Sequence, residues 1–328
     1  MTAALVEVQG LEKRFTVGGA WLSGRRRVIH AVDGVSFAID RGEVLGLVGE
    51  SGCGKSVTSL SIMRLVPPPG RVAAGRVLFE GEDLLAKDAE AMRRVRGAQI
   101  AMVFQEPMTS LNPVFSIGDQ IASAVMAHGG AGRHEAWQRT VAMLDLVQIP
   151  SPRQRARDYP HQLSGGLRQR AMIAMALASG PALLIADEPT TALDVTIQAQ
   201  ILDLLRRLQA ERGMAVLLIT HDLGVVAELC HRVAVIYAGR IVELAPVESL
   251  FARPIHPYTR GLLQCLPHPS RFGQQLVSIE GVPPDLRQAE AGCRFAPRCA
   301  YALPSCRAAE PSLEEREPGH FVACPVVT

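Results

Sequence analysis

The chain has 328 residues, which is enough for two or three structural units built around a large core. Its formal charge is only +2 at pH 7, so composition provides no basic surface of the kind that double-stranded nucleic acid requires, and we expect no nucleic-acid partner. No signal-peptide pattern opens the chain, and its longest uncharged run, residues 171–186, is too short to span a bilayer, so we expect a cytosolic protein.

The N-terminal region contains two stretches in which apolar and polar residues alternate, at 5–8 and 31–39, with a Gly- and Arg-rich insertion between them. This pattern predicts an antiparallel sheet with a long loop. Phe15 lies at the end of the first stretch and has two interpretations. It stacks on a nucleobase, or it is an ordinary core aromatic.

A glycine-rich loop follows an apolar run at 43–48 that is suited to a buried parallel strand, and residues 57–65 after it can continue as a helix. This phosphate loop fits the pattern G-x-x-x-x-G-K-[ST] and consists of Gly49, Glu50, Ser51, Gly52, Cys53, Gly54, Lys55 and Ser56. Glycines let a backbone curl around phosphate oxygens, and amides at a helix N-terminus stabilise an anion. We therefore expect nucleotide binding, with Lys55 on the β- and γ-phosphates and Ser56 on Mg²⁺.

Two further apolar runs, at 77–79 and 100–104, predict strands, and the second ends on Gln105. Ligands of parallel sheets bind at the carboxyl ends of the strands, so Gln105 is a candidate contact for Mg²⁺ or the attacking water. Residues 117–147 have a helical pattern with a flexible break at 129–132. This pattern predicts a small helical subdomain inserted into an α/β core.

A second candidate anion site begins at Ser164, Gly165 and Gly166, which start a predicted helix that runs to residue 178. These residues supply a hydroxyl group and unobstructed amides at a helix N-terminus. The chain therefore carries two predicted phosphate-binding helix starts.

Two more apolar strands, predicted at 182–186 and 214–220, end on polar side chains. The first ends on Asp187 and Glu188: a carboxylate in this position is typical of a Mg²⁺ ligand, and Glu188 can accept a proton from the attacking water. The second ends on His221, which either contacts the γ-phosphate or has no special role.

The ordered set of motifs resembles the ATPase subunits of ABC transporters over about residues 5–250. The resemblance implies a P-loop NTPase fold for residues 1–252, with an antiparallel β subdomain and an inserted helical subdomain at about 106–178. It identifies the phosphate loop with Walker A, Gln105 with the Q-loop glutamine and Asp187 with the end of Walker B. Glu188 is then the catalytic base, His221 the switch histidine and Asp194 a D-loop contact to the nucleotide.

The signature of this family corresponds to residues 163–167, and here Leu167 replaces the usual glutamine. Because Ser164, Gly165 and Gly166 are present, we expect ATP binding to survive, whereas the effect on turnover stays open. Subunits of this family dimerise head to tail, so that the phosphate loop of one subunit and the signature of the other hold each ATP. The second ATPase subunit is identical to this chain or related to it.

Residues 253–328 form a predicted extension whose His256-Pro257-Tyr258-Thr259-Arg260 resembles the start of the C-terminal region in oligopeptide and dipeptide permease ATPases. The run at 104–113 resembles the same subfamily. The resemblance implies the ATP-hydrolysing subunit of a peptide importer, peripheral on the cytoplasmic side of the inner membrane. Its partners would be two membrane-spanning permease subunits and, through them, an extracytoplasmic substrate-binding protein. The subfamily also contains nickel, opine and glutathione importers, so those substrates remain alternatives.

Four cysteines lie in the Pro-rich tail with the spacing C-x5-C-x6-C-x17-C; they are Cys293, Cys299, Cys306 and Cys324. The cytosol disfavours disulfides, and four thiolates suit either tetrahedral Zn²⁺ or an iron–sulfur cluster. Members of the peptide-permease subfamily carry a [4Fe-4S] cluster in a similar tail. The resemblance therefore favours that cluster, with zinc second and four unligated cysteines as the remaining alternative.

Two functions of other classes compete with transport. A soluble ABC ATPase acting on nucleic acid or ribosomes usually has a long coiled-coil insertion or two tandem cassettes, and the sequence shows neither. An ATP-binding regulatory module with weak hydrolysis would not need the catalytic groups Glu188 and His221. Transport is therefore the function that the sequence favours.

Overall fold

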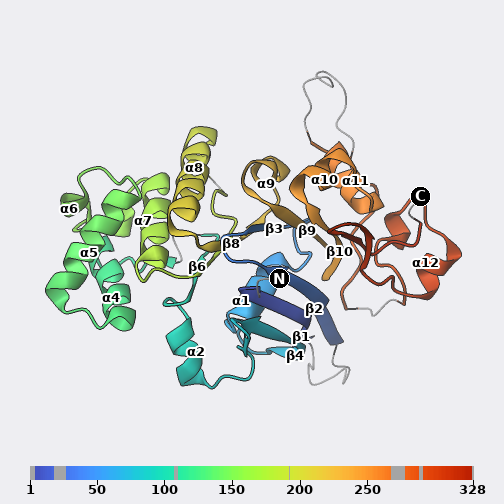
Figure 1. Cartoon of the computed structure of the whole chain (residues 1–328), viewed down its shortest axis with the longest axis horizontal. Helices are drawn as coiled ribbons and strands as arrows, with labels where there is room; N and C mark the ends of the chain where they lie inside the picture. Colours follow the sequence, from blue (N-terminus) through green and yellow to red (C-terminus); the bar gives the residue numbers. More distant parts are fainter. Residues whose placement is uncertain are drawn as a thin grey trace. The chain divides into compact units, whose positions relative to one another are not determined.

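The computed structural model describes residues 4–17, 27–106, 110–191, 193–266, 278–287 and 291–326. Its contacts divide the chain into two compact units, which are described separately (Figure 1). Unit 1 comprises residues 1–39, 44–85 and 219–328, and unit 2 comprises residues 40–43 and 86–218. The expected boundary at residue 252 and the expected helical subdomain at about 106–178 remain predictions.

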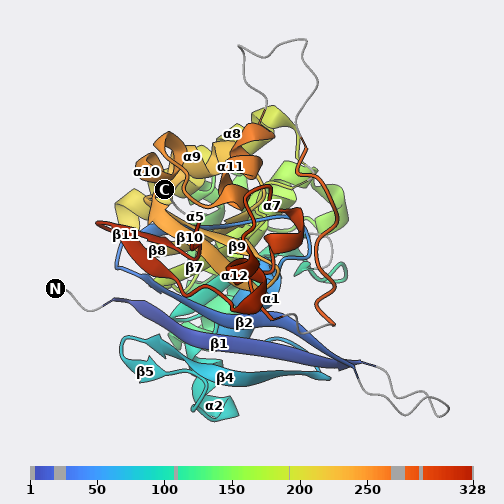
Figure 2. The same ribbon diagram turned by 90° about the vertical axis from the view of Figure 1, so that its right-hand side faces the viewer.

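Unit 1 contains a four-stranded antiparallel sheet in the order β2-β1-β4-β5 (Figure 2). Its strands are β1 (Val6–Val17), β2 (Arg27–Ile39), β4 (Gly70–Phe79) and β5 (Glu82–Asp83). The predicted antiparallel pairing is confirmed, and it runs from Val6 opposite Ile39 to Val17 opposite Arg27. The strands are longer than the alternating stretches in the sequence because bulges in β1, such as the one between Val8 and Leu11, interrupt the alternation.

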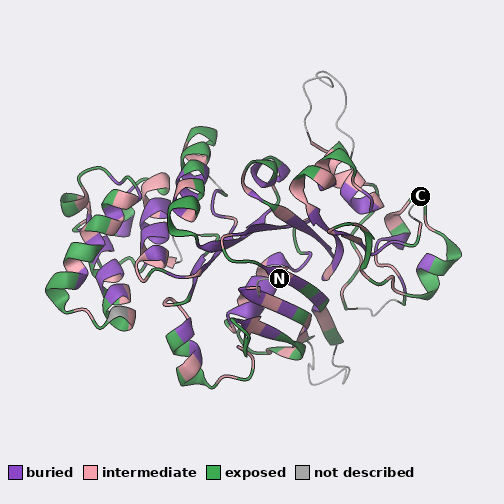
Figure 3. Ribbon diagram, viewed as in Figure 1, coloured by how far each residue is buried: buried purple, intermediate pink, exposed green. Residues whose placement is uncertain are grey.

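The second sheet of unit 1 has the strand order β11-β12-β10-β9-β3. Its strands are β3 (Val44–Val48), β9 (Arg232–Tyr237), β10 (Arg240–Pro246), β11 (Glu314–Glu317) and β12 (His320–Val322). All five residues of β3 are buried, and β3 pairs in parallel with β9, as its continuous apolar run predicted (Figure 3). The helices of unit 1 are α1 (Lys55–Ile62), α9 (Leu223–Leu229), α10 (Val247–Ala252), α11 (Pro257–Gln264), η3 (Ala296–Arg298) and α12 (Pro304–Ala308).

The C-terminal extension is fastened to this sheet by β12, which pairs antiparallel with β10. Glu243 of β10 is fully buried, and its carboxylate accepts the backbone N–H groups of Ile255 at 2.8 Å and His256 at 3.0 Å. Nε2 of His320, in β12, lies 2.7 Å from the same carboxylate. The sequence did not predict this attachment. The strand that pairs with β12, β11, consists only of charged residues and therefore shows no apolar alternation.

Unit 2 contains the strands β6 (Ile100–Val103) and β7 (Leu183–Asp187) and begins β8 (Ala215–Thr220), whose last two residues belong to unit 1. The order is β8-β7-β6, and β6 pairs in parallel with β7 so that Val103 lies opposite Ala186. The helices of unit 2 are α2 (Ala89–Val95), α4 (Ile117–Gly129), α5 (Arg133–Leu146), α6 (Pro152–Arg155), η1 (Pro160–Gln162), α7 (Gly165–Leu177) and α8 (Val195–Arg212).

The predicted break in the helical pattern of unit 2 is confirmed, since α4 ends at Gly129 and α5 begins at Arg133. Gly130 caps α4 with a φ of +59°, a conformation that glycine adopts without strain. The two helices share a small apolar cluster of Ala122, Val125 and Ala136. Within the described residues, no helix combines the length and the hydropathy needed to cross a membrane.

Candidate active site

The phosphate loop joins β3 to α1, so the predicted strand–loop–helix context is confirmed. Neighbouring backbone approaches the loop so closely that two of its glycines have no room for a side chain. A Cβ on Gly49 would lie 2.2 Å from the carbonyl oxygen of Ile236, and one on Gly54 would lie 2.4 Å from that of Ala31. Only glycine therefore permits this path of the loop.

Lys55, the first residue of α1, is directed back over its own loop. Its Nζ donates to the carbonyl oxygens of Gly49 at 2.7 Å and Glu50 at 3.1 Å, and the residue is 5% exposed. A buried ammonium group needs such partners, and here the loop backbone supplies them. The loop thus holds the lysine ammonium group against its own carbonyl oxygens.

Gln105 and Glu188 meet in unit 2 because the parallel strands β6 and β7 end side by side. Nε2 of Gln105 donates to Oε2 of Glu188 at 2.8 Å, and the Thr191 hydroxyl donates to the same oxygen at 2.9 Å. Asp187, the last residue of β7, is buried. The arrangement presents an oriented carboxylate at the carboxyl edge of a sheet, where it can accept a proton.

The backbone of Glu188 is itself unusual, with a φ of +47°. A residue with a Cβ adopts this left-handed conformation at a cost, and such outliers concentrate at functional sites. The sequence identified Glu188 as a candidate base, but nothing in the sequence pattern indicates this strain.

Ser164 is the N-cap of α7, as predicted for the second helix start, and its hydroxyl accepts the N–H of Leu167 at 3.4 Å. A Cβ on Gly166 would lie 2.7 Å from Cγ2 of Ile197, so this glycine allows α7 and α8 to pack closely. Asp194 caps α8 by accepting the N–H of Ile197 at 2.9 Å. Position 192, two residues before Asp194 in the same predicted D-loop, lies outside the described residues.

Phe15 and His221 lie in unit 1. Phe15 is half-buried in β1 opposite Gly70 of β4, and a Cβ on Gly70 would lie 2.6 Å from Cε1 of the Phe15 ring. The ring therefore covers a position without a side chain, an arrangement compatible with both interpretations of Phe15. His221 is exposed and follows the end of β8, and Asp222 after it caps α9.

The four cysteines of the extension all lie within the described residues and are free thiols. Burial raises the pKa of Cys293 to about 11, and burial also raises the pKa of Cys299 and of Cys324. The charges of Cys299 and Cys306 contribute further to the raised pKa of Cys324, so the thiols lie close enough to influence one another. Nowhere in the described ranges do three or more His, Cys, Asp or Glu side chains form a group that could hold a metal ion. The positions of the four thiols in the structure therefore do not form a ligand set.

Comparisons with known proteins extend over almost the whole chain. Residues 32–191 match the family described as ABC transporter, and residues 242–306 match the one described as oligopeptide/dipeptide transporter, C-terminal region. A probable peptide ABC transporter ATP-binding protein of Sinorhizobium fredii is 55% identical over 322 residues, 98% of this chain and 94% of that protein. The dipeptide transport ATP-binding protein DppD is 48% identical in Bacillus subtilis, over 98% of this chain and 94% of that protein. DppD of Escherichia coli is 50% identical over 90% of both chains.

Solved structures agree with these matches. A dimeric post-hydrolysis state of an ATP-binding cassette bound to ADP and Pi has a TM-score of 0.65 and 27% identity, covering 74% of this chain and 98% of that one. An ABC transporter component of Clostridium perfringens has a TM-score of 0.63 and 26% identity, covering 76% of this chain and 91% of that one. The predicted fold, an α/β ABC ATPase cassette, is confirmed. The chain belongs to the ATPase family of ABC transporter ATP-binding proteins, in the group that carries the oligopeptide/dipeptide transporter C-terminal region.

Proposed function

We propose that this chain is the ATP-hydrolysing subunit of an importer for di- or oligopeptides. The arrangement that carries the proposal is the pair of strand ends at which Gln105 and Thr191 hold the Glu188 carboxylate. The relatives at 48–55% identity are named for peptide or dipeptide transport, which supports the substrate class.

Unit 1 supplies the phosphate-binding groups in this proposal. The amides of the phosphate loop and the N-terminus of α1 stabilise the phosphate charge, and Lys55 binds the β- and γ-phosphates. Ser56 would hold Mg²⁺, which neutralises phosphate charge when bound, and Asp187 of unit 2 stays a separate candidate Mg²⁺ ligand. Phe15 is the candidate contact to the base, and His221 the candidate contact to the γ-phosphate.

Unit 2 supplies the group that activates water. The Glu188 carboxylate accepts a proton from the attacking water, and the Gln105 amide and the Thr191 hydroxyl fix the direction of that carboxylate. Gln105 is also a candidate Mg²⁺ contact. General-base catalysis of this kind contributes roughly 10²–10⁴-fold to a rate.

A second ATPase subunit, identical or related, completes the proposed site. Its Ser164, Gly165 and Gly166 would bind the phosphates of the ATP held by the first subunit, and Asp194 is a candidate contact to the nucleotide. We further infer two membrane-spanning permease subunits and an extracytoplasmic substrate-binding protein, with this chain peripheral on the cytoplasmic side of the inner membrane. The names of the relatives support these partners.

For the extension we propose a [4Fe-4S] cluster held by Cys293, Cys299, Cys306 and Cys324, with zinc as the alternative. The spacing of the four cysteines in the sequence supports a shared ligand set. The cluster would tie together a segment with little regular structure of its own.

The substrate class is tested with the complex that copurifies with a tagged chain, reconstituted into liposomes with its binding protein. We expect multispanning membrane subunits in the complex and ATP hydrolysis that rises when di- or oligopeptides are added. If Ni²⁺, an opine or glutathione stimulates ATP hydrolysis and peptides do not, the transported substrate is that compound and the proposed peptide substrate is wrong. Association with ribosomes or nucleic acid in place of membrane subunits would contradict transport altogether.

A further inference from the structure

Glu50, the second residue of the phosphate loop, is bound by the C-terminal extension. Nη1 of Arg298 donates to Oε2 of Glu50 at 2.8 Å, and Nη2 donates to Oε1 at 3.1 Å. The Arg298 side chain is only 4% exposed, so this bidentate pair is shielded from solvent. It differs in this respect from exposed ion pairs, which contribute little.

The backbone of Glu50 is bound as well. Its N–H donates to the hydroxyl oxygen of Tyr258, in α11, at 2.9 Å, and its carbonyl oxygen accepts Nζ of Lys55 at 3.1 Å. The extension thus holds the side chain and the amide of the residue whose carbonyl positions the loop lysine. Glu50 thus connects the extension to Lys55, the proposed phosphate contact.

Aromatic packing fixes Arg298 in place. Phe295 is buried, and its ring centroid lies 5.2 Å from that of Tyr237 and 5.5 Å from that of Tyr258. Arg298 lies over the Tyr237 ring, 5.8 Å from its centroid, and also donates to the carbonyl oxygens of Ile279 and Glu280. With these partners the buried guanidinium is well satisfied, as a buried charge requires.

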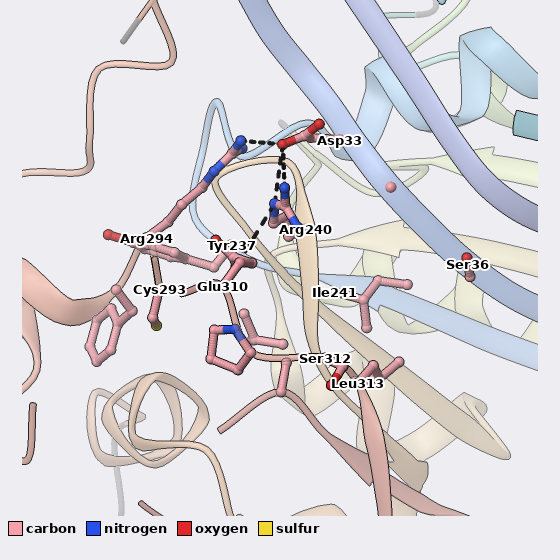
Figure 4. Close-up of a pocket in the computed structure, with 15 residues that line it drawn as sticks. Asp33, Ser36, Tyr237, Arg240, Ile241, Cys293, Arg294, Glu310, Ser312 and Leu313 are labelled. Carbon is pink, nitrogen blue, oxygen red and sulfur yellow. Dashed lines mark hydrogen bonds and ion pairs between the residues drawn. The ribbon is translucent and has the colours of Figure 1, made fainter. Parts of the chain in front are cut away.

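Arg294 provides a second connection to the same loop. It donates to the Asp33 carboxylate, which also accepts Arg240 at 2.8 Å, beside a cavity of about 370 Å³ (Figure 4). Arg294 also donates to the carbonyl oxygen of Ala238, and the next residue, Gly239, donates its N–H to the carbonyl oxygen of Cys53 at 2.7 Å. The extension therefore contacts the loop directly at Glu50 and indirectly at Cys53, through the turn that contains Ala238 and Gly239.

We propose that residues 294–298 of the C-terminal extension position the phosphate loop for ATP. The inference rests on the proposed function, because it takes the phosphate loop as the ATP site. A loop whose backbone is held before the ligand arrives loses less entropy on binding, so these contacts increase affinity. Arg298 is a positioning residue in this scheme, since it acts through Glu50 and touches no reacting group.

The test measures the binding of a fluorescent ATP analogue with Mg²⁺, and the ATPase rate, in the full chain. For Arg298→Gln we expect the Kd to rise roughly tenfold, the size of a typical coupling between sites, with kcat at saturating ATP nearly unchanged. Arg298→Lys keeps the charge but loses the bidentate geometry, so its Kd should lie between those of the wild type and Arg298→Gln. The matched control is Arg287→Gln in the same extension: Arg287 is exposed and pairs only locally with Asp285, so affinity should not change.

A double-mutant cycle separates positioning from a general loss of stability. If Arg298 acts through Glu50, Glu50→Gln should weaken binding by a similar factor, and the double variant should bind about as well as either single variant. Wild-type affinity in either single variant, while Lys55→Ala abolishes binding, would overturn the inference and leave the proposed function intact. If Arg298→Gln unfolds, the change on the less buried side of the pair, Glu50→Gln, decides alone. Absence of ATP binding by the unmodified chain would overturn the proposed function and this inference with it.

Discussion

Glu188 lies just after the end of β7, and both its side chain and its backbone are constrained there. The sequence places it after an apolar strand, and the structure shows its carboxylate bonded to Gln105 and Thr191 and its backbone at a φ of +47°. Strain of about 1–3 kcal/mol persists at such a position only where the surroundings impose it. In this structure the parallel register of β6 and β7 brings the two strand ends together, and Gln105 and Thr191 hold the Glu188 side chain there.

Replacing Glu188 by glutamine should therefore stop hydrolysis but not binding. Glu188→Gln keeps the size of the side chain and removes the proton acceptor, so we expect turnover to fall by about 100-fold or more. The measurement compares single-turnover hydrolysis with the affinity for a fluorescent ATP analogue. Glu211→Gln, an exposed change in α8, serves as the control and should leave both quantities unchanged. Turnover at the wild-type rate in Glu188→Gln would remove the residue from its proposed role as base.

The contacts of Arg298 and Tyr258 with Glu50 could not be predicted from the sequence. Arg298 and Tyr258 lie in the extension, 248 and 208 positions from the loop residue that they bind. The sequence around Tyr258 indicated only a family resemblance, and Arg298 belongs to none of the motifs that the sequence shows. Contacts across such distances leave no local periodicity that a single sequence could reveal.

At the scale of elements, apolar runs predicted the strands well. β3 is apolar throughout and β7 is apolar up to Asp187; both strands are fully buried and lie within a residue or two of the expected positions. The β11–β12 hairpin was missed because its first strand is entirely charged and therefore has no apolar face. Its pairing with β10 depends on the buried Glu243, which binds two backbone N–H groups of the extension and His320.

His256, the N-cap of α11, makes this attachment sensitive to pH. Its Nδ1 accepts the N–H of Tyr258 at 3.1 Å, and burial lowers the pKa of His256 from 6.5 to about 3. Between these values the unfolded chain binds a proton at this position and the folded chain does not. Acidification below pH 6.5 should therefore reduce the free energy of unfolding by up to about 1.4 kcal/mol per pH unit from this group.

The contribution of His256 can be isolated by comparison with His256→Asn, whose side chain can still cap the helix. Urea unfolding at several pH values from 7 to 4.5 should show a steeper loss of stability in the wild type than in the variant. Parallel pH curves for the two proteins would show that the proton-linked destabilisation arises elsewhere.

At the scale of the whole molecule, the family match explains why one chain carries two predicted anion sites. In the proposed head-to-tail dimer, each subunit would use its phosphate loop for its own ATP and its signature for the ATP of its partner. The Leu167 N–H, bonded to Ser164, shows that the departure from the usual glutamine leaves the helix cap intact. ATP binding is therefore expected to survive, as the sequence indicated.

The four cysteines of the extension lead to a prediction of the metal content of the purified protein. Protein purified without oxygen should contain iron and acid-labile sulfide in the ratio of a [4Fe-4S] cluster, and Cys299→Ser should lose both. Cys265→Ser is the matched control, because Cys265 lies outside the set of four. Stoichiometric zinc without iron would replace the cluster by the zinc alternative, and protein free of both metals would contradict the proposed ligand set.

The sequence by itself determined the strand–loop–helix context of the phosphate loop, the buried strands β3 and β7 and the carboxylate at the end of β7. These features follow from local rules: glycine where backbone crowds the Cα, apolar runs where strands are buried, and polar residues where strands end. Only the tertiary structure decided that the extension holds the loop. Arg298 meets Glu50 and β12 meets β10 because folding brings distant segments together, and the bonds exist only once both partners are buried in place.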